Sequence, residues 1–440
     1  MKARIRQFLS DLGHTFFLVP GLMVLGGIVL ALITLGIDRS GVLPAWLMTG
    51  QFLYNGGATG ARTLLGAVAS STIGVASTVF SITIAALSLA AGQMGPRLLR
   101  NFTSDRGNQV TLGIFLGTFS YALMVLRSVR TQEEGMFIPH LALSVSILLA
   151  LICVATLVYF VGHMASRINV DTVITLVSRD VRGAIKRLTQ DDPGAPPPDE
   201  TFWLEAVVVR DARRGYLQQL DHSGLADWAC ERKTAIRLLV RPGDYVFPGA
   251  PIALLTVPVE GAGDAIRDAT ALGSLRVSGS DIEFAIRQLV EVAVRALSPG
   301  INDPHTAISV LDHLGASLCD VAQVHMRSGV LLREGRPALV CPAVDYDGLS
   351  DAMFHMIRQN AVGSAAVRIR MLDVLIAVAE CERIEARLGS LQRHADLILA
   401  DCERDIANPS DLQDVSNRHR AFSAIQDKVS ARSLTATQSA

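Results

Sequence analysis

The segment Ser298–His305 holds the residues of this sequence that are best suited to binding a small anion. It reads Ser-Pro-Gly-Ile-Asn-Asp-Pro-His, and a helix is expected to begin near Thr306. The first N–H groups of a helix have no partner inside the helix, so they attract anions. A plain turn in which Asp303 caps the next helix explains the same pattern, and both interpretations stay open. The ligand-binding candidates are Arg287, Arg295, Ser298, Asn302, Asp303 and His305.

Two histidines raise the question of a metal site. His305 and His313 are eight residues apart, with Asp303 and Asp312 beside them. Metal ions need ligands that converge, and nothing in the sequence makes these four converge, so no metal site is predicted. The sequence also has no P-loop, H-E-x-x-H or G-x-S-x-G motif, so we predict no catalytic residues and no cofactor, and rank an enzyme last.

A stripe of small side chains marks one apolar stretch near the N-terminus. Of residues 66–92, 18 of 27 are Gly, Ala, Ser or Thr. Seven of these recur at steps of three or four, which places them on one face of a helix. They are Ser70, Gly74, Ser77, Ser81, Ala85, Ser88 and Gly92. Such a face either packs closely against other helices in lipid or, in several copies, lines a pore around an oligomer axis. Hydroxyls can bond back to helix carbonyls, so they alone do not require water.

Arginines follow this stripe at the end of the stretch. Arg97, Arg100 and Arg106 lie in an amphipathic segment after a Gly-x-Pro stop signal. They are candidates for a basic inner mouth that favours anions. Contact with lipid headgroups is the alternative use of such residues.

Four stretches are long and apolar enough to cross the ~30 Å hydrocarbon core of a bilayer, which takes about 20 helical residues. They cover residues 16–37, 64–91, 110–129 and 138–164, and Arg127 is the one Lys, Arg, Asp or Glu among them. These stretches lack the two-residue alternation of barrel strands. About four transmembrane helices, with the lipid bilayer as partner, are therefore predicted within residues 1–165.

Charge divides the chain into two parts. Residues 1–170 hold 11 Lys and Arg against 5 Asp and Glu, and the remainder holds 29 against 36. The short connections rich in Lys and Arg are the N-terminal tail, the one after the second stretch and the one after the fourth, which places both termini in the cytoplasm. The acidic remainder lacks the basic face that nucleic acid requires, so no nucleic-acid partner is expected.

The part after the membrane helices is predicted to be a cytoplasmic α+β region. We expect a juxtamembrane helix and Pro-rich linker over 166–200, a small β-rich module over 201–258, a mainly helical domain over 259–430 and a disordered tail over 431–440. The glycine spacing at 243–252 resembles the half-barrel repeat of lipoyl- and biotinyl-like sandwiches. Lys233 is not in the hairpin context that those carriers modify, so the resemblance implies shape alone.

Several segments together resemble one family. They include Gln93-x-Gly-Pro-Arg-Leu-Leu-Arg-Asn-Phe102, Gly113-x-Phe-x-Gly-Thr-Phe-x-Tyr121, Ile286-Arg-Gln-Leu-Val290 and Ala296-Leu-Ser-Pro-Gly-Ile-Asn-Asp-Pro304. This pattern is similar to the bacterial inner-membrane proteins grouped as domain of unknown function 2254, over roughly residues 10–430. The resemblance implies a multi-pass inner-membrane protein with a cytoplasmic C-terminal domain, and it implies no activity.

Three functions are compatible with these features. The first is a homo-oligomeric channel or permeation pathway that the second transmembrane helix lines and the cytoplasmic domain regulates. The second is a membrane-anchored sensor or scaffold without a pore, which binds a small anionic ligand or ion at 298–305. The third is a membrane enzyme. A symmetric oligomer with Ser77 and Ser81 near its axis would favour the first.

Overall fold

The structure, a computed structural model, describes residues 16–40, 57–95, 105–130, 137–276 and 282–438. The chain divides into two compact units. The first, here called the membrane unit, covers residues 10–92 and 96–169. The second, here called the α+β unit, is formed mainly by residues 170–440.

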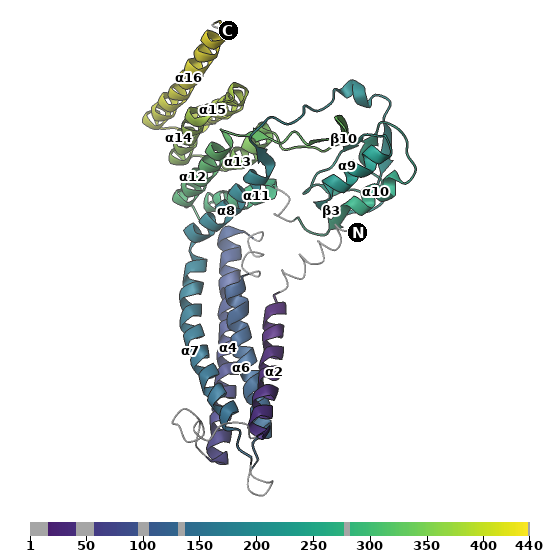
Figure 1. Cartoon of the computed structure of the whole chain (residues 1–440). Coiled ribbons are helices and arrows are strands. Elements are labelled where there is room, and N and C mark those ends of the chain that lie inside the picture. The colour runs from purple at the N-terminus through teal and green to yellow at the C-terminus, as the bar shows by residue number, and fades with distance from the viewer. Residues whose placement is uncertain (1–15, 41–56, 96–104, 131–136, 277–281, 439–440) are drawn as a thin grey trace. The chain divides into compact units, whose positions relative to one another are not determined.

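The membrane unit contains four helices that are long and apolar enough to cross a membrane, which confirms the four predicted spans. They are α2 (Leu18–Ser40), α4 (Ala58–Met94), α6 (Arg106–Ser128) and α7 (His140–Ile168) (Figure 1). Large apolar side chains such as Leu25 on α2 and Val158 on α7 are exposed on the outer surface of this bundle. An apolar outer surface of this kind suits contact with lipid tails, where it costs no free energy.

Helices α2 and α6 pack at very short range because three glycines meet between them. A Cβ atom added to Gly27 would lie 2.3 Å from the carbonyl oxygen of Gly117. A Cβ atom at Gly117 would lie 2.9 Å from the carbonyl oxygen of Met23, and one at Gly113 would lie 2.4 Å from the Met23 sulfur. Small residues allow this approach of two backbones in lipid. We call Gly27, Gly113 and Gly117 the glycine seam.

Polar contacts fix one end of the bundle. The carboxylate of Asp38, on α2, accepts hydrogen bonds of 3.0 Å from the N–H groups of Leu141 and Ala142. It thereby caps the first turn of α7, whose N–H groups have no partner within the helix. The buried Tyr121 hydroxyl, on α6, donates to the carbonyl oxygen of Ala142 at 2.9 Å. Three helices are thus joined by hydrogen bonds at this end.

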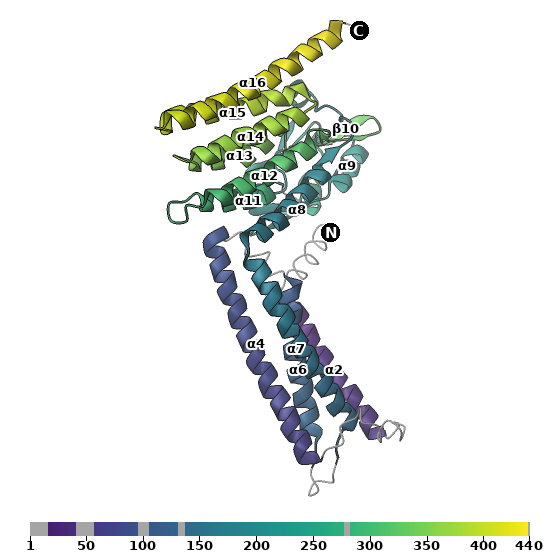
Figure 2. The same cartoon turned by 90° about the vertical axis from the view of Figure 1, so that its left-hand side faces the viewer.

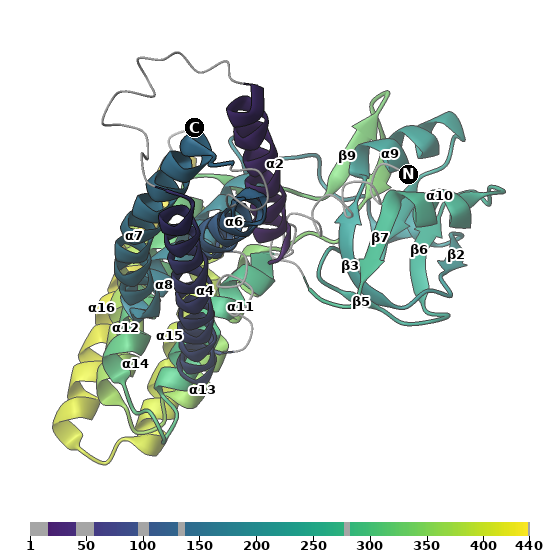
Figure 3. The same cartoon turned by 90° about the horizontal axis from the view of Figure 1, so that it is seen from below.

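The described residues of the α+β unit form two main sheets and no closed barrel (Figure 3). The five-stranded sheet has the order β2 (Val207–Arg210), β6 (Pro251–Leu255), β4 (Ile236–Leu238), β10 (Arg336–Val340) and β9 (Val330–Arg333). The three-stranded sheet has the order β5 (Tyr245–Val246), β3 (Gly215–Leu220) and β7 (Thr270–Gly273). The pair β4–β10 is parallel, and the other pairs are antiparallel. A two-stranded pair joins β1 (Thr189–Gln190) to β8 (His325–Met326).

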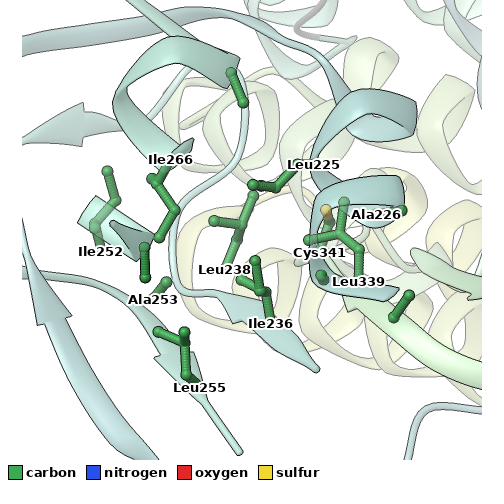
Figure 4. Packing of buried hydrophobic residues seen from close by; sticks show 14 of the residues in the cluster. Leu225, Ala226, Ile236, Leu238, Ile252, Ala253, Leu255, Ile266, Leu339 and Cys341 are labelled. Atoms are coloured by element: carbon green, nitrogen blue, oxygen red, sulfur yellow. The ribbon is translucent and has the colours of Figure 1, made fainter. Parts of the chain in front are cut away.

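One hydrophobic core joins these sheets to α9 (His222–Glu231) and α10 (Ala262–Ala269). Figure 4 shows Ile236 and Leu238 of β4 packed among the side chains of β6, α9 and α10, together with Leu339 of β10. Strands β9 and β10 therefore belong to the β-rich core, although the sequence analysis expected residues after 259 to be mainly helical. Alternating apolar residues over so few positions do not distinguish a strand from a short helix.

The remaining α-helices of the α+β unit pack against one another in a stack (Figure 2). They are α8 (Val170–Leu188), α11 (Ile282–Ala296), α12 (Pro304–Val321), α13 (Tyr346–Asn360), α14 (Ala365–Cys381), α15 (Glu385–Asp405) and α16 (Pro409–Gln438). The fully buried Arg368 of α14 donates to the carbonyl oxygen of Asp401 at 3.0 Å and pairs with Asp405 at 2.7 Å, which ties α14 to α15. Helix α16 continues to Gln438, into the segment that the sequence analysis expected to be a disordered tail.

Candidate functional site

Helix α4 has two faces made of small residues, and one of them packs against the bundle. The buried residues of α4 are Ala61, Leu65, Ala69, Thr72, Ala76, Val79, Ala86 and Ala90. All of them except Thr72 and Ala90 belong to hydrophobic clusters that also contain large side chains of α6 and α7, among them Tyr121, Phe115 and Phe160. This face explains how α4 is held in the membrane unit, where Figure 2 shows it to one side of the other three helices.

The predicted stripe lies on the other face of α4. All seven of its residues, from Ser70 to Gly92, are exposed. At 3.6 residues per turn, the stripe and the buried face are centred about 180° apart around the helix. A Cβ atom added to Gly74 would meet no atom within 4 Å. Among the residues that the structure describes, the stripe is therefore not buried against the other helices of its own chain.

Hydroxyl groups along the stripe bond to the backbone of α4. Ser70 donates to the carbonyl oxygen of Gly66 at 2.8 Å, and Ser81 donates to that of Ser77 at 2.9 Å. These bonds satisfy the hydroxyl protons and leave oxygen lone pairs on the outer surface. Exposed Ile84 and Phe80 flank the stripe. The outer face of α4 is therefore a line of small and weakly polar groups beside larger apolar ones.

The arginines predicted to form an inner mouth are described only in part. Arg97 and Arg100 lie outside the described residues. Arg106 is the first residue of α6, and its side chain is exposed. Whether the three surround a common opening stays a prediction.

The segment Ser298–His305 is a helix cap with its own internal hydrogen bonds. Asp303 accepts from the N–H of Thr306 at 3.2 Å and from its hydroxyl at 2.6 Å. The hydroxyl bond and the N–H bonds lower the pKa of Asp303. The N–H groups of Ile301 and Asn302 donate to the carbonyl oxygen of Ser298. The carboxylate thus occupies the position at the start of α12 where an external anion was expected.

The other candidates near this cap also have partners. Arg287 pairs with Glu283 at 3.2 Å, and Arg295 lies 3.7 Å from Glu291, each one turn away on α11. The Ser298 hydroxyl donates to the carbonyl oxygen of Arg295 at 2.6 Å. His305 and Asn302 are exposed, and Asn302 has a φ of 50°. The structure therefore explains these residues as a turn, and ligand binding there stays a prediction.

A cleft of about 560 Å³ lies elsewhere in the α+β unit. It is bordered by α8, the end of β3, the start of α9, the residues just before β5 and the segment 327–344. Arg187, Arg241, Arg327 and His222 line it, and none of its described lining residues is acidic. Arg241 also pairs with Glu283. None of the six candidates named from the sequence lines this cleft.

Comparisons with known proteins agree with the membrane architecture. A family model described as "Predicted membrane protein (DUF2254)" matches residues 13–377. The chain belongs to this family. It is 31% identical over 374 residues to uncharacterised proteins of Mycobacterium tuberculosis (strain CDC 1551 / Oshkosh) and Mycobacterium bovis (strain ATCC BAA-935 / AF2122/97). Each alignment covers 81% of this chain and 70% of the relative. No solved structure matches the chain.

In this DUF2254 protein, a buried polar cluster at the other end of the bundle was not found from the sequence. Asp105 caps α6 by accepting from the N–H of Gly107 at 2.7 Å. Its carboxylate also lies 3.0 Å from His163 Nε2 and 2.8 Å from Arg167 Nε, both on α7. Two features of the sequence could have indicated this cluster: an Asp just before one apolar stretch and a His near the end of another. The sequence does not show that α6 and α7 are neighbours, so it did not show that these residues meet. The cluster joins α6 to α7 and explains these three residues structurally.

Proposed function

We propose that this membrane protein forms a homo-oligomer in which copies of α4 line a permeation pathway for an ion or small solute, under the control of the α+β unit. The observation that carries the proposal is the exposure of the whole stripe on the outer face of α4. A stripe buried within its own chain would have removed this function.

The comparison with the glycine seam supports the proposal. Close packing through small residues occurs within this chain at Gly27, Gly113 and Gly117, between α2 and α6. The stripe of α4 takes no part in it. Small residues facing outward suit the approach of another helix or of water, whereas the exposed leucines and valines of α2 and α7 suit lipid. Further copies of the same chain supply such a neighbour.

Orientation is part of the same proposal. The Lys and Arg distribution favours both termini in the cytoplasm, which places Arg106 and Asp105 at the inner side. The family resemblance implies that the membrane is a bacterial inner membrane. The α+β unit is then cytoplasmic, where it can respond to ligands. Arg97, Arg100 and Arg106 would surround the inner mouth.

The first experiment measures the oligomeric state of the full chain in nanodiscs by native mass spectrometry. A closed oligomer of four or more copies is expected, and a monomer would contradict the proposal. The second experiment records conductance in planar bilayers. Ser77→Trp is expected to abolish it, because the indole ring fills the axis.

The matched control is Val158→Trp, which places the same ring on the exposed face of α7. It is expected to leave conductance unchanged. Equal loss of conductance in both variants would show a general effect on the bundle and would count against α4 as the lining helix. Oligomer formation by both variants must be checked in the same samples.

A second candidate function follows from the cleft. We propose that the α+β unit senses a small anion there, because three arginines and His222 line a space of about 560 Å³. Ligand pockets of roughly 300–1,000 Å³ are usual for small molecules. A guanidinium group can donate two parallel hydrogen bonds to two oxygens of one phosphate or carboxylate group. This geometry favours a phosphorylated or carboxylated ligand.

This candidate is tested by thermal unfolding of the full chain with inorganic pyrophosphate and with ADP. A rise in the unfolding midpoint is expected, and Arg327→Ala should remove it. Arg333→Ala is the control, since Arg333 pairs with Asp227 at 2.6 Å and does not line the cleft. Absence of any shift with both anions would contradict the sensor.

A further inference from the structure

Three metal-ligating side chains converge in the helical stack of the α+β unit. Asp351 and His355 lie one turn apart on the same face of α13, and His394 faces them from α15. One ligand atom from each of the three lies within 4.8 Å of the other two. Nothing in the permeation pathway or the arginine cleft involves these residues.

The distances fit a shared metal ion. Asp351 Oδ1 lies 3.2 Å from His355 Nε2 and 3.0 Å from His394 Nε2. A tetrahedral Zn²⁺ ion with bonds of about 2.0–2.1 Å separates its ligand atoms by roughly 3.3 Å. The two distances from Asp351 are close to this value, and the ligand atoms of the two histidines lie within 4.8 Å of each other. An ion between the three atoms therefore requires, at most, a shift of the two imidazoles toward each other.

His394 is the decisive residue because it is fully buried and lacks hydrogen bonds. Its side chain is 0% exposed. Neither ring nitrogen makes a hydrogen bond, since the 3.0 Å contact with Asp351 does not have hydrogen-bond geometry. His355 Nδ1 has no partner either. Buried polar groups are normally satisfied, so an imidazole left in this state calls for a partner that the protein atoms do not supply.

An ordinary charge network explains only part of this arrangement. Arg393 pairs with Asp351, and such a pair accounts for the carboxylate by itself. It does not account for His394, because neither Arg393 nor any other described group makes a hydrogen bond to its ring nitrogens. With a metal bound, Arg393 has the role of a partner that holds the ligating carboxylate in place.

The ligand set indicates which ions fit. Two imidazoles and one carboxylate suit Zn²⁺ and neighbouring divalent transition ions such as Fe²⁺, whereas Mg²⁺ and Ca²⁺ prefer sites made of oxygen atoms. Asp351 and His355 are partly exposed, at 36% and 31% of their side chains. Water can therefore reach the site and complete the coordination.

We propose that Asp351, His355 and His394 form a binding site for a divalent transition-metal ion of the Zn²⁺ class, with one ion per chain. The site joins α13 to α15. It stands independently of the permeation pathway, because it needs neither an oligomer nor α4.

The experiment uses the purified full chain, stripped with a chelator, reloaded with Zn²⁺ and desalted. Zinc is counted by inductively coupled plasma mass spectrometry, and thermal unfolding is followed with and without the ion. One zinc per chain is expected, with a higher unfolding midpoint. His355→Ala and His394→Ala should each lose the bound zinc and the midpoint shift.

His419→Ala is the matched control, because His419 forms a 2.7 Å pair with Asp396 but has no third ligand in the described structure. It should keep one zinc per chain. If His394→Ala fails to fold, the partly exposed His355→Ala variant decides. A wild-type chain that retains no zinc, or a His355→Ala chain that retains as much as wild type, would overturn the proposal.

Discussion

The glycine seam and the α4 stripe are made of similar residues but have opposite surroundings. In the seam, Gly27 and Gly117 bring two backbones so close that no Cβ atom fits. In the stripe, a Cβ atom at Gly74 would meet nothing within 4 Å. Small residues on either surface allow close packing in lipid. Of these two surfaces, the seam packs within the chain, and the stripe is exposed in the part of the chain that the structure describes.

This difference shows how a small-residue pattern should be interpreted. Small side chains allow another molecule or helix to come close to the backbone. Which one does so depends on what lies opposite them in the folded protein. The seam has α2 opposite α6, so its contact is internal. The stripe has no helix opposite it among the described residues, so its neighbour is a second protein copy, water or lipid. Substitutions that add the same methyl group to the seam and to the stripe distinguish an internal contact from an outward-facing surface.

The largest expected effect comes from adding one methyl group to the seam. Gly27→Ala places a Cβ atom against the Gly117 carbonyl oxygen, and backbone cannot move aside as a side chain can. We expect the free energy of unfolding to fall by about 3 kcal/mol. The measurement is unfolding in mixed detergent micelles, followed by circular dichroism.

Gly74→Ala is the control for that variant. It adds the same methyl group to an exposed helix position, where Ala is better than Gly by up to about 1 kcal/mol. Equal destabilisation of both variants would mean that the stripe is as tightly packed as the seam, and the contrast between them would fail.

The two faces of α4 are compared by a second pair of substitutions. Ala76 is 2% exposed on the buried face, and Ala85 is exposed on the stripe. Ala76→Leu should cost about 1–3 kcal/mol through overpacking. Ala85→Leu should leave the fold of the chain unchanged and instead alter oligomer formation, which native mass spectrometry measures. A fold loss in Ala85→Leu without any change of oligomer would contradict an outward-facing stripe.

The sequence predicted the membrane unit well because its signals are local. Length and apolarity identify a span without knowledge of its neighbours, and the four helices are confirmed. The spacing of Gly113 and Gly117 can also be read from the sequence. Identifying Gly27 as their partner requires knowing which helices are adjacent, and the sequence does not show this. The same missing information hid the contacts of Asp105 with His163 and of Asp38 with the start of α7.

Sites in the α+β unit were harder to predict because they join distant segments. The cap at Asp303 was open to prediction, since Asp, Pro and Thr follow one another in sequence. Asp351 and His355 are four residues apart in a region predicted to be mainly helical, and this spacing was a usable signal. His394 lies on another helix, and no local rule fixes which face of α15 turns toward α13. The arginines of the cleft come from α8, the segment before β5 and the segment before β9, so only the fold brings them together.

A smaller effect is expected where the seam meets a flexible side chain. A Cβ atom at Gly113 would lie 2.4 Å from the sulfur of Met23. Met has three rotatable bonds and can move aside, so Gly113→Ala should cost about 1 kcal/mol, less than Gly27→Ala. Unfolding in the same micelles ranks the two variants. A cost equal to that of Gly27→Ala would show that Met23 is held as rigidly as backbone.

The smallest expected effect on stability concerns a hydroxyl of the stripe. The Ser81 hydroxyl donates only to the Ser77 carbonyl oxygen of its own helix, so Ser81→Ala should change the free energy of unfolding by less than about 0.5 kcal/mol. Conductance measured on the same preparation then decides what the hydroxyl faces. Along a wet pathway, the loss of an oxygen that can contact a permeating ion lowers conductance. Against lipid, alanine is at least as good as serine and nothing changes. A stability loss above 1 kcal/mol would instead reveal a partner for Ser81 within the folded assembly, and would make the stripe a packing surface like the seam.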